Sequence, residues 1–190
     1  MLPEGLSERV ASWIKGLDQP AVAVLELLAV IGSRVEPDDL VTLTGQPLQA
    51  LGAILEKLVR CRLVFEEERG RELTYELAHP LFQEAVYQGI GGARRRALHR
   101  GVGRALLASN RFGEAAPHFA RSAKVGDREA IEALREGLRQ AQGREAHGEA
   151  LSILGALVEL LPANDDSWLE VLTAMSWGPS GWSTTGPTTS

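Results

Sequence analysis

The stretch YELAHPLFQEAVY, residues 75–87, decides how this chain is organised. Its first part alternates apolar and polar side chains, with Tyr75 and Leu77 on one side, which predicts a short strand. Pro80 suits the first position of a helix, and the residue before a proline is pushed out of helical geometry. His79 is therefore expected at the junction between a strand and the helix that follows it.

Three helices and a hairpin are predicted upstream of this stretch. Residues 20–31 are apolar nearly all round, as in a helix buried at the centre of a small domain, and Gly32 can end that helix. Periodicity and turn residues predict two more helices and two strands around the segment 67–71, with Gly70 at the tip. These elements are expected at residues 36–43, 47–61, 63–66 and 73–77. Together they predict a winged-helix domain at residues 18–90 in a mainly α-helical protein.

An arginine-rich helix is predicted at residues 91–109, where it would connect two parts of the chain. One face of this helix is apolar, and the opposite face holds the only concentration of basic side chains in the sequence. The candidates for a surface that contacts another domain or a partner protein are Arg95, Arg96, His99, Arg100 and Arg104. The alternative is a solvated helix face with no partner.

A three-residue motif recurs in the second half of the chain, where Gly113-Glu114-Ala115 returns as Gly148-Glu149-Ala150 after 35 residues. A period near 34 residues is typical of tetratricopeptide (TPR) helix pairs, and Pro162 stands where such a repeat would close. Residues 110–162 are therefore predicted to form TPR-like antiparallel helical repeats, although the leading Trp, Leu and Gly of the consensus are missing. About three such repeats are needed for stability, so an array this short must either pack against the preceding domain or be truncated.

The two ends of the chain are assigned to a linker helix and a tail. Residues 1–17 suit a linker helix, and residues 163–190 are expected to form a C-terminal tail. From residue 176 to residue 190 the chain uses only Ser, Thr, Gly, Pro and Trp. Such a composition cannot form a packed core, so the tail is predicted to be mostly disordered from residue 176.

Composition argues against several classes of function. The net charge of −5 does not indicate a general binder of nucleic acid or of membrane surfaces, which are both anionic. The single cysteine, Cys61, suits a reducing compartment, and no apolar run approaches the roughly 20 residues of a membrane span. The first residues also lack the basic start of a signal peptide. We therefore expect a cytoplasmic protein without membrane contact.

The usual motifs of catalysis are missing from the sequence. There is no Gly-Lys pair, so the phosphate-binding P-loop of ATPases is absent. The four histidines are far apart and have no His or Cys companion at metal-ligand spacing, so no metal site is expected. Neither a Gly-x-Ser-x-Gly nor a His-Glu-x-x-His motif occurs. The chain is expected not to be an enzyme.

The order of these elements resembles a known family. A strand that ends in His79-Pro80-Leu81, then Glu84-Ala85-Val86-Tyr87, then an arginine-rich helix with a histidine, is similar to the winged-helix segment of LuxR/MalT-type regulators. Those regulators belong to the signal-transduction ATPases called STAND proteins, and the resemblance covers about residues 2–162.

The resemblance implies a non-catalytic regulatory and interaction module. Such a module would couple the nucleotide state of a P-loop domain, which this chain does not contain, to the helical repeats. The implied partner is that P-loop ATPase domain, in the same parent protein or in another protein. ATP or ADP would be bound by the parent protein, with no cofactor in this chain. The sequence carries no pattern that predicts an oligomeric state.

His79 is the nucleotide-sensor candidate that the resemblance implies. Its position is similar to that of the histidine in the Met-His-Asp motif, with which apoptosome and plant-immunity STAND ATPases contact the β-phosphate of ADP. Here Ala78-His79-Pro80 replaces that motif, so only the histidine carries over. The alternative is a histidine that caps or packs against the helix it precedes. The family also shows an Arg-x-x-x-His pattern, matched by Arg95 and His99, which implies a packing junction between winged helix and repeats.

Two other functions fit the same outline. A free-standing winged-helix transcription factor would need a positive recognition helix and wing, whereas residues 44–72 hold five basic and five acidic side chains. DNA is therefore an unfavoured partner. A TPR-like scaffold for protein–protein contacts is the other alternative.

Overall fold

The computed structural model describes residues 13–165, 168, 169, 171 and 173 of the chain. The described part is mainly α-helical and contains one two-stranded antiparallel sheet, as expected. The chain divides into two compact units, with the boundary between Ala105 and Leu106. Within the described residues, no helix is both long and apolar enough to cross a membrane.

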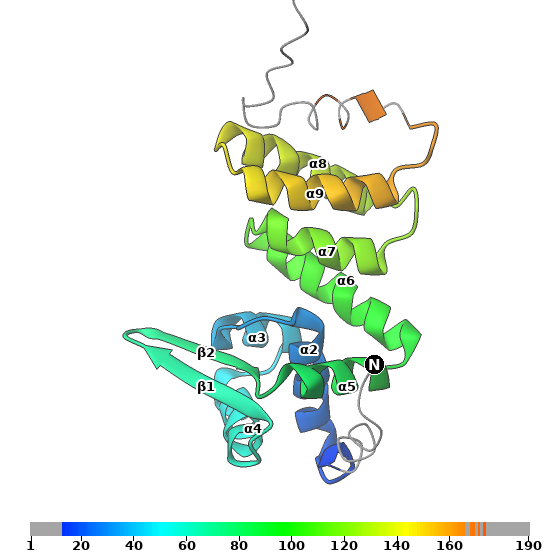
Figure 1. The fold of residues 1–190 in the computed structure, drawn as a ribbon. Helices are drawn as coiled ribbons and strands as arrows, with labels where there is room; N and C mark the ends of the chain where they lie inside the picture. Colours follow the sequence, from blue (N-terminus) through cyan, green and yellow to red (C-terminus); the bar gives the residue numbers. More distant parts are fainter. Residues whose placement is uncertain (1–12, 166–167, 170, 172, 174–190) are drawn as a thin grey trace, which may run out of the picture. The chain divides into compact units, whose positions relative to one another are not determined.

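The core of the first unit is built around helix α2, Gln19–Ile31 (Figure 1). Asp18 caps the helix by accepting a hydrogen bond from the Ala21 N–H at 3.0 Å, and Gly32 ends it with φ of +75°. Seven of its thirteen residues are buried, because helices α4 and α5 and strand β2 all pack on it. The nearly continuous apolar character of this segment predicted such a central position.

Two further helices precede the hairpin. Helix α3 spans Pro37–Thr44 and helix α4 spans Leu48–Arg60. Helix α4 buries Leu51, Leu55 and Leu58 on one face, as its periodicity predicted. The expected elements at 36–43 and 47–61 are therefore confirmed to within one residue at each end.

The hairpin consists of β1, Val64–Arg69, and β2, Glu72–Leu77, and it projects away from the helices of the first unit (Figure 1). Arg69 pairs with Glu72, so the loop contains only Gly70 and Arg71. Gly70 has φ of +67°, a conformation that favours glycine at the first central position of a tight hairpin turn. The prediction of shorter strands around residues 67–71 was wrong, because the charged residues at 67–69 continue the ladder.

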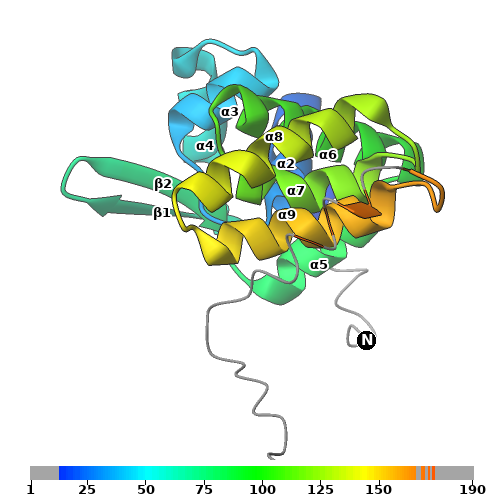
Figure 2. The same cartoon turned by 90° about the horizontal axis from the view of Figure 1, so that it is seen from above.

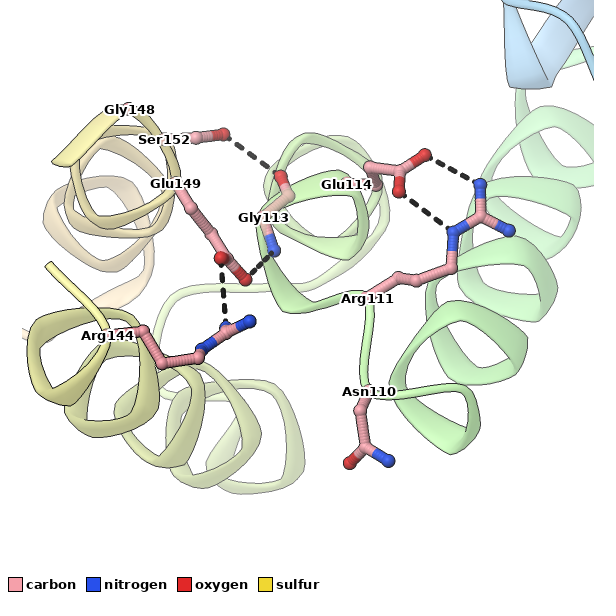
Figure 3. A pocket seen from close by; sticks show the side chains of 8 residues that line it. All are labelled: Asn110, Arg111, Gly113, Glu114, Arg144, Gly148, Glu149 and Ser152. Atoms are coloured by element: carbon pink, nitrogen blue, oxygen red, sulfur yellow. Dashed lines mark hydrogen bonds and ion pairs between the residues drawn. The ribbon is translucent and has the colours of Figure 1, made fainter. Parts of the chain in front are cut away.

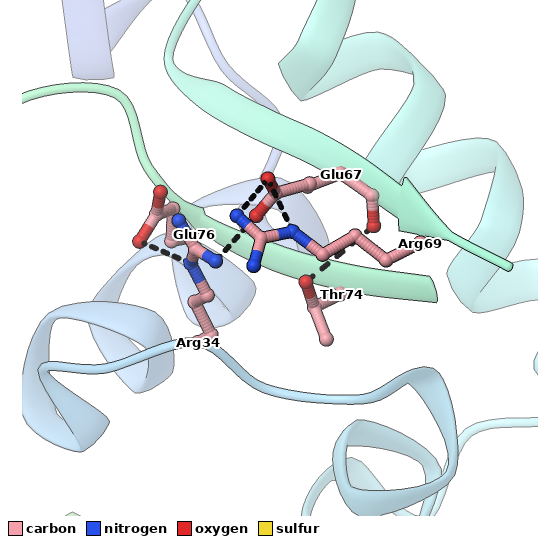
Figure 4. A network of polar contacts seen from close by, with 5 residues as sticks. All are labelled: Arg34, Glu67, Arg69, Thr74 and Glu76. Atoms are coloured by element: carbon pink, nitrogen blue, oxygen red, sulfur yellow. Dashed lines mark hydrogen bonds and ion pairs between the residues drawn. The ribbon is translucent and has the colours of Figure 1, made fainter. Parts of the chain in front are cut away.

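Ion pairs explain why this charged segment is a strand. The Glu67 carboxylate contacts the guanidinium groups of both Arg34 and Arg69, and Arg34 also binds Glu76 of β2 at 3.3 Å (Figure 4). Thr74 lies opposite Glu67 in the ladder and points toward the same face. The charges therefore stabilise one side of the hairpin instead of disrupting it.

A third short segment joins the sheet at Val35, which forms an isolated antiparallel bridge with Tyr75. Tyr75 is buried, and its hydroxyl donates a hydrogen bond to Glu66 at 2.7 Å. Burial raises the pKa of the Tyr75 hydroxyl, and the nearby Glu66 carboxylate raises it further. The start of the stretch that opened the sequence analysis is thus fixed in the core of the first unit.

Two helices follow the hairpin. Helix α5 spans Pro80–Gly89, and helix α6 spans Gly92–Ala108 and crosses the boundary between the units. They match the helix predicted after Pro80 and the arginine-rich helix predicted at 91–109.

The second unit contains helices α7 (Phe112–Ser122), α8 (Arg128–Gly143) and α9 (His147–Leu160). These three helices pack on one another, and α9 lies against both α7 and α8 (Figure 2). Their shared core includes the fully buried side chains of Phe119, Leu134, Leu138, Ile153 and Leu157. The two copies of the Gly-Glu-Ala motif lie in the first turns of α7 and α9.

The start of the predicted tail belongs to this core. Val171 is only 1% exposed, and the indole N–H of Trp168 donates a hydrogen bond to the Pro162 carbonyl at 2.8 Å. Part of the segment 163–190 that was assigned to the tail thus packs on the core of the second unit. The disorder expected from residue 176 and most of the linker helix expected at 1–17 lie outside the described residues.

Candidate functional site

His79 occupies the N-cap of α5. Its backbone is extended, with φ of −157° and ψ of 138°, because the following proline disfavours helical geometry there. The Leu81 N–H donates a hydrogen bond to Nδ1 of the exposed imidazole at 3.0 Å. A ring that accepts at Nδ1 carries its proton on Nε2, so only Nε2 remains to donate to another group. His79 therefore caps helix α5, which is one of the two roles predicted for it, the other being nucleotide sensing.

Replacing His79 with alanine should lower the stability of the chain by about 0.5–2 kcal/mol, because one amide at the start of α5 loses its acceptor. Asparagine can supply an acceptor at the same position, so His79→Asn should recover most of that loss. Urea unfolding of the three proteins measures the difference. If His79→Ala were as stable as the unchanged chain, the hydrogen bond from Leu81 would not contribute to folding.

Tyr87 and His99 join α5 to α6. The Tyr87 hydroxyl and Nε2 of His99 are 2.9 Å apart, and the two rings meet edge to face. The Arg95 guanidinium lies 4.8 Å from the centroid of the Tyr87 ring, within the range of a cation–π contact. These three side chains, which we call the Tyr87 cluster, fix the angle between the two helices within the first unit.

His99 was predicted to belong to an exposed contact surface, and this prediction was wrong. It is 2% exposed, whereas Arg96 and Arg104 are exposed and Arg95 and Arg100 are half-buried. The physical reason is its position on the helix, where the same stripe carries the buried Val102 and Gly103. The Arg-x-x-x-His pair, Arg95 and His99, contacts α5 through Tyr87.

The first arginine of the run also has a local role. The Arg94 guanidinium binds the Glu26 carboxylate of α2 at 2.5 Å. At least one basic side chain at the start of α6 therefore forms an ion pair within the first unit. Arg96 and Arg104, two turns apart, are the members of the predicted partner surface that the structure leaves most exposed.

Residues 44–72, the segment with a helix-turn-helix outline, contain five basic side chains, of which three are paired with carboxylates; the other two, Arg62 and Arg71, are exposed. Lys57 binds Asp18 at 2.7 Å, and this hydrogen bond lowers the pKa of the Asp18 carboxyl. Arg60 lies 3.6 Å from Glu56, and Arg69 on the hairpin binds Glu67. Charges paired in this way contribute little positive potential toward a phosphate backbone.

The second unit has an open recess of about 480 Å³ at the starts of α7 and α9 (Figure 3). Its charged side chains bind one another: Arg111 contacts Glu114 at 2.7 Å, and Arg144 contacts Glu149 at 3.0 Å. The Arg111 guanidinium lowers the pKa of the Glu114 carboxyl. Each arginine thus faces a glutamate: the Arg111–Glu114 pair lies within the start of α7, and the Arg144–Glu149 pair joins the end of α8 to α9.

The recess includes a contact that the sequence did not predict. The Glu149 carboxylate accepts a hydrogen bond from the Gly113 N–H at 3.2 Å, and the Ser152 hydroxyl donates to the Gly113 carbonyl at 3.1 Å (Figure 3). The second copy of the Gly-Glu-Ala motif thus caps the helix that carries the first copy. The recurrence of the motif was visible in the sequence, but its mutual contact was not.

In the part of the chain that the structure describes, no group of three or more His, Cys, Asp or Glu side chains could hold a metal ion. When the sequence was compared with protein-family models and with curated proteins, no match was found.

Proposed function

We propose that the chain is a non-catalytic regulatory module of a STAND-type signalling or transcriptional regulator. In this proposal, residues 18–90 are a winged helix and residues 110–162 are TPR-like repeats. The module couples the nucleotide state of a P-loop ATPase domain to those repeats. Support comes from the order of α2, α3, α4 and the hairpin, with the Val35–Tyr75 bridge beside it.

The observation that carries the proposal is the charge pairing on the helix-turn-helix segment and hairpin. A winged helix that reads DNA needs free cations on its recognition helix and wing. Here three of the five basic side chains of residues 44–72, those of Lys57, Arg60 and Arg69, are each paired with a carboxylate, and five acidic side chains balance the charge of the segment. This arrangement favours a protein partner over DNA and argues against the alternative of a free-standing transcription factor.

The exposed arginines of α6 are the proposed contact for the P-loop domain. Arg96 and Arg104 lie on one face of the helix, where they can meet acidic side chains of a partner. His79 stays a nucleotide-sensor candidate in this proposal, since its Nε2 can still donate while Nδ1 serves as the cap.

The first step of the test is to examine the coding sequence next to the one for this chain. If the proposal holds, a P-loop coding sequence lies next to the one for this chain, and the encoded domain should bind the chain in a calorimetric titration with ADP present. The double variant Arg96→Glu, Arg104→Glu should weaken that binding at least about tenfold, or ~1.4 kcal/mol. The matched control is Arg128→Glu, Arg139→Glu in α8, which makes the same change of charge on exposed side chains of the second unit.

Two results would contradict the proposal. Equal weakening by both double variants would mean that only net charge matters. Saturable sub-micromolar binding of the chain to a random DNA duplex near 150 mM salt would establish the transcription-factor alternative instead.

A further inference from the structure

The outer face of α9 carries an apolar stripe that the described residues leave uncovered. Its members recur at helical spacing: Gly148, Leu151, Gly155 and Val158. Leu151 is 67% exposed and Val158 is 41% exposed. No atom of the described residues lies within 4 Å of a Cβ built on either glycine. We call these four residues the α9 stripe.

The equivalent face of α7 shows what kind of element packs against such a stripe. Subtracting the repeat of 35 residues from the α9 stripe gives Gly113, Ala116, Ala120 and Ala123 on α7. Ala116 is fully buried, and the other two alanines pack against the core of the second unit. Since α9 packs on α7, the α9 stripe is the repeat-related copy of a helix face that is already occupied.

Glycine has a specific role at the start of that occupied face. A Cβ on Gly113 would lie 2.5 Å from Cγ of Glu149, so the glutamate fits only because Gly113 has no side chain. The Glu149 carboxylate then accepts from the Gly113 N–H at 3.2 Å (Figure 3). One glutamate thus docks the helix and caps the neighbouring helix.

The equivalent place on α9 lacks that glutamate. The N-cap residue, Ala146, makes no side-chain capping hydrogen bond, and the space above Gly148 is open among the described residues.

We propose that the α9 stripe binds an amphipathic helix of another protein, with a glutamate in its first turn. The partner glutamate occupies the place above Gly148 and accepts from its N–H, as Glu149 does at Gly113. Apolar side chains further along the partner helix cover Leu151 and Val158. The proposal rests on the internal repeat and is independent of the proposed regulatory function.

The test uses a fluorescently labelled peptide with the sequence of residues 144–161, because α9 is the helix that fills the equivalent site. The full chain should bind this peptide saturably in an anisotropy titration. Gly148→Ala should weaken binding at least tenfold, since the added Cβ takes the place of the glutamate Cγ. A peptide with glutamine in place of Glu149 should also bind more weakly.

Gly148→Ala is a fair test because it leaves the fold of the chain intact. Its Cβ enters open space, and circular dichroism should show unchanged helix content. The control is Gly143→Ala at the end of α8, which is also free of neighbours among the described residues and should bind the peptide normally.

Three outcomes would overturn the proposal. The first is no saturable binding, or binding that Gly148→Ala leaves unchanged. The second is stronger binding after removal of residues 174–190, which would mean that this segment occupies the stripe. The third is self-association of the chain, detected by sedimentation equilibrium and abolished by Gly148→Ala, which would make a second copy the occupant.

Discussion

Replacing Gly137 with alanine should lower the free energy of unfolding of the second unit by about 1–3 kcal/mol. Gly137 lies in the middle of α8, where a Cβ would be 2.5 Å from Cβ of Phe112 and 2.7 Å from its Cγ and Cδ1. Phe112 is buried at the start of α7, so it cannot swing into solvent without leaving the core. The better helix propensity of alanine, up to about 1 kcal/mol, offsets only part of this overpacking.

Gly155→Ala is the matched control for that substitution. Gly155 also lies in the middle of a helix of the second unit, and its Cβ would meet no atom of the described residues within 4 Å. This variant should be as stable as the unchanged chain or more stable by up to about 1 kcal/mol. Urea unfolding followed by circular dichroism compares the two. If both variants behaved alike, the close approach of α7 and α8 would be refuted.

The elements that were predicted well are those with strong local signals. Helix α2 could be placed because its apolar run ends at a glycine that adopts positive φ, and the start of α5 because Pro80 follows an alternating strand. The full length of the hairpin could not be read, since glutamates at 67 and 68 disfavour a strand locally. Contacts of Glu67 with Arg34, 33 residues away in sequence, reverse that preference.

The candidate site was harder to predict because its contacts cross between elements. His99 was grouped with the arginines by charge, although its spacing to Val102 already placed it on the buried stripe. Its hydrogen bond to Tyr87 joins two different helices, and the hydrophobic periodicity of a sequence does not predict contacts between helices. Val171 was missed for a different reason: the repeat was expected to close at Pro162, so the buried residues that follow this proline were assigned to the tail.

Acid should destabilise the second unit through His118. This side chain of α7 is only 7% exposed. Burial lowers the pKa of His118 to about 4, and repulsion from Arg121 acts in the same direction, while Glu114 opposes it weakly. The folded chain therefore keeps this imidazole neutral at a pH where an unfolded chain, with an ordinary pKa near 6.5, takes up a proton.

The sign and the pH window follow from these two pKa values. Above about pH 6.5 both states are neutral at His118 and stability is unaffected. As the pH falls from about 6.5 to 4, only the unfolded state gains the proton, so stability is lost. The loss should reach about 2 kcal/mol by pH 5 and about 3 kcal/mol near pH 4.

The variant His118→Gln separates this effect from other titrations, because the chain has four histidines and the Glu114 carboxyl also titrates at lower pH. Glutamine is polar but carries no charge at any of these pH values. Urea unfolding at pH 7 and pH 5 should show a drop in the unchanged chain that is larger by about 2 kcal/mol than the drop in the variant. Equal drops in the two proteins would mean that His118 can be protonated in the folded state without cost. The burial of this imidazole would then be incorrect.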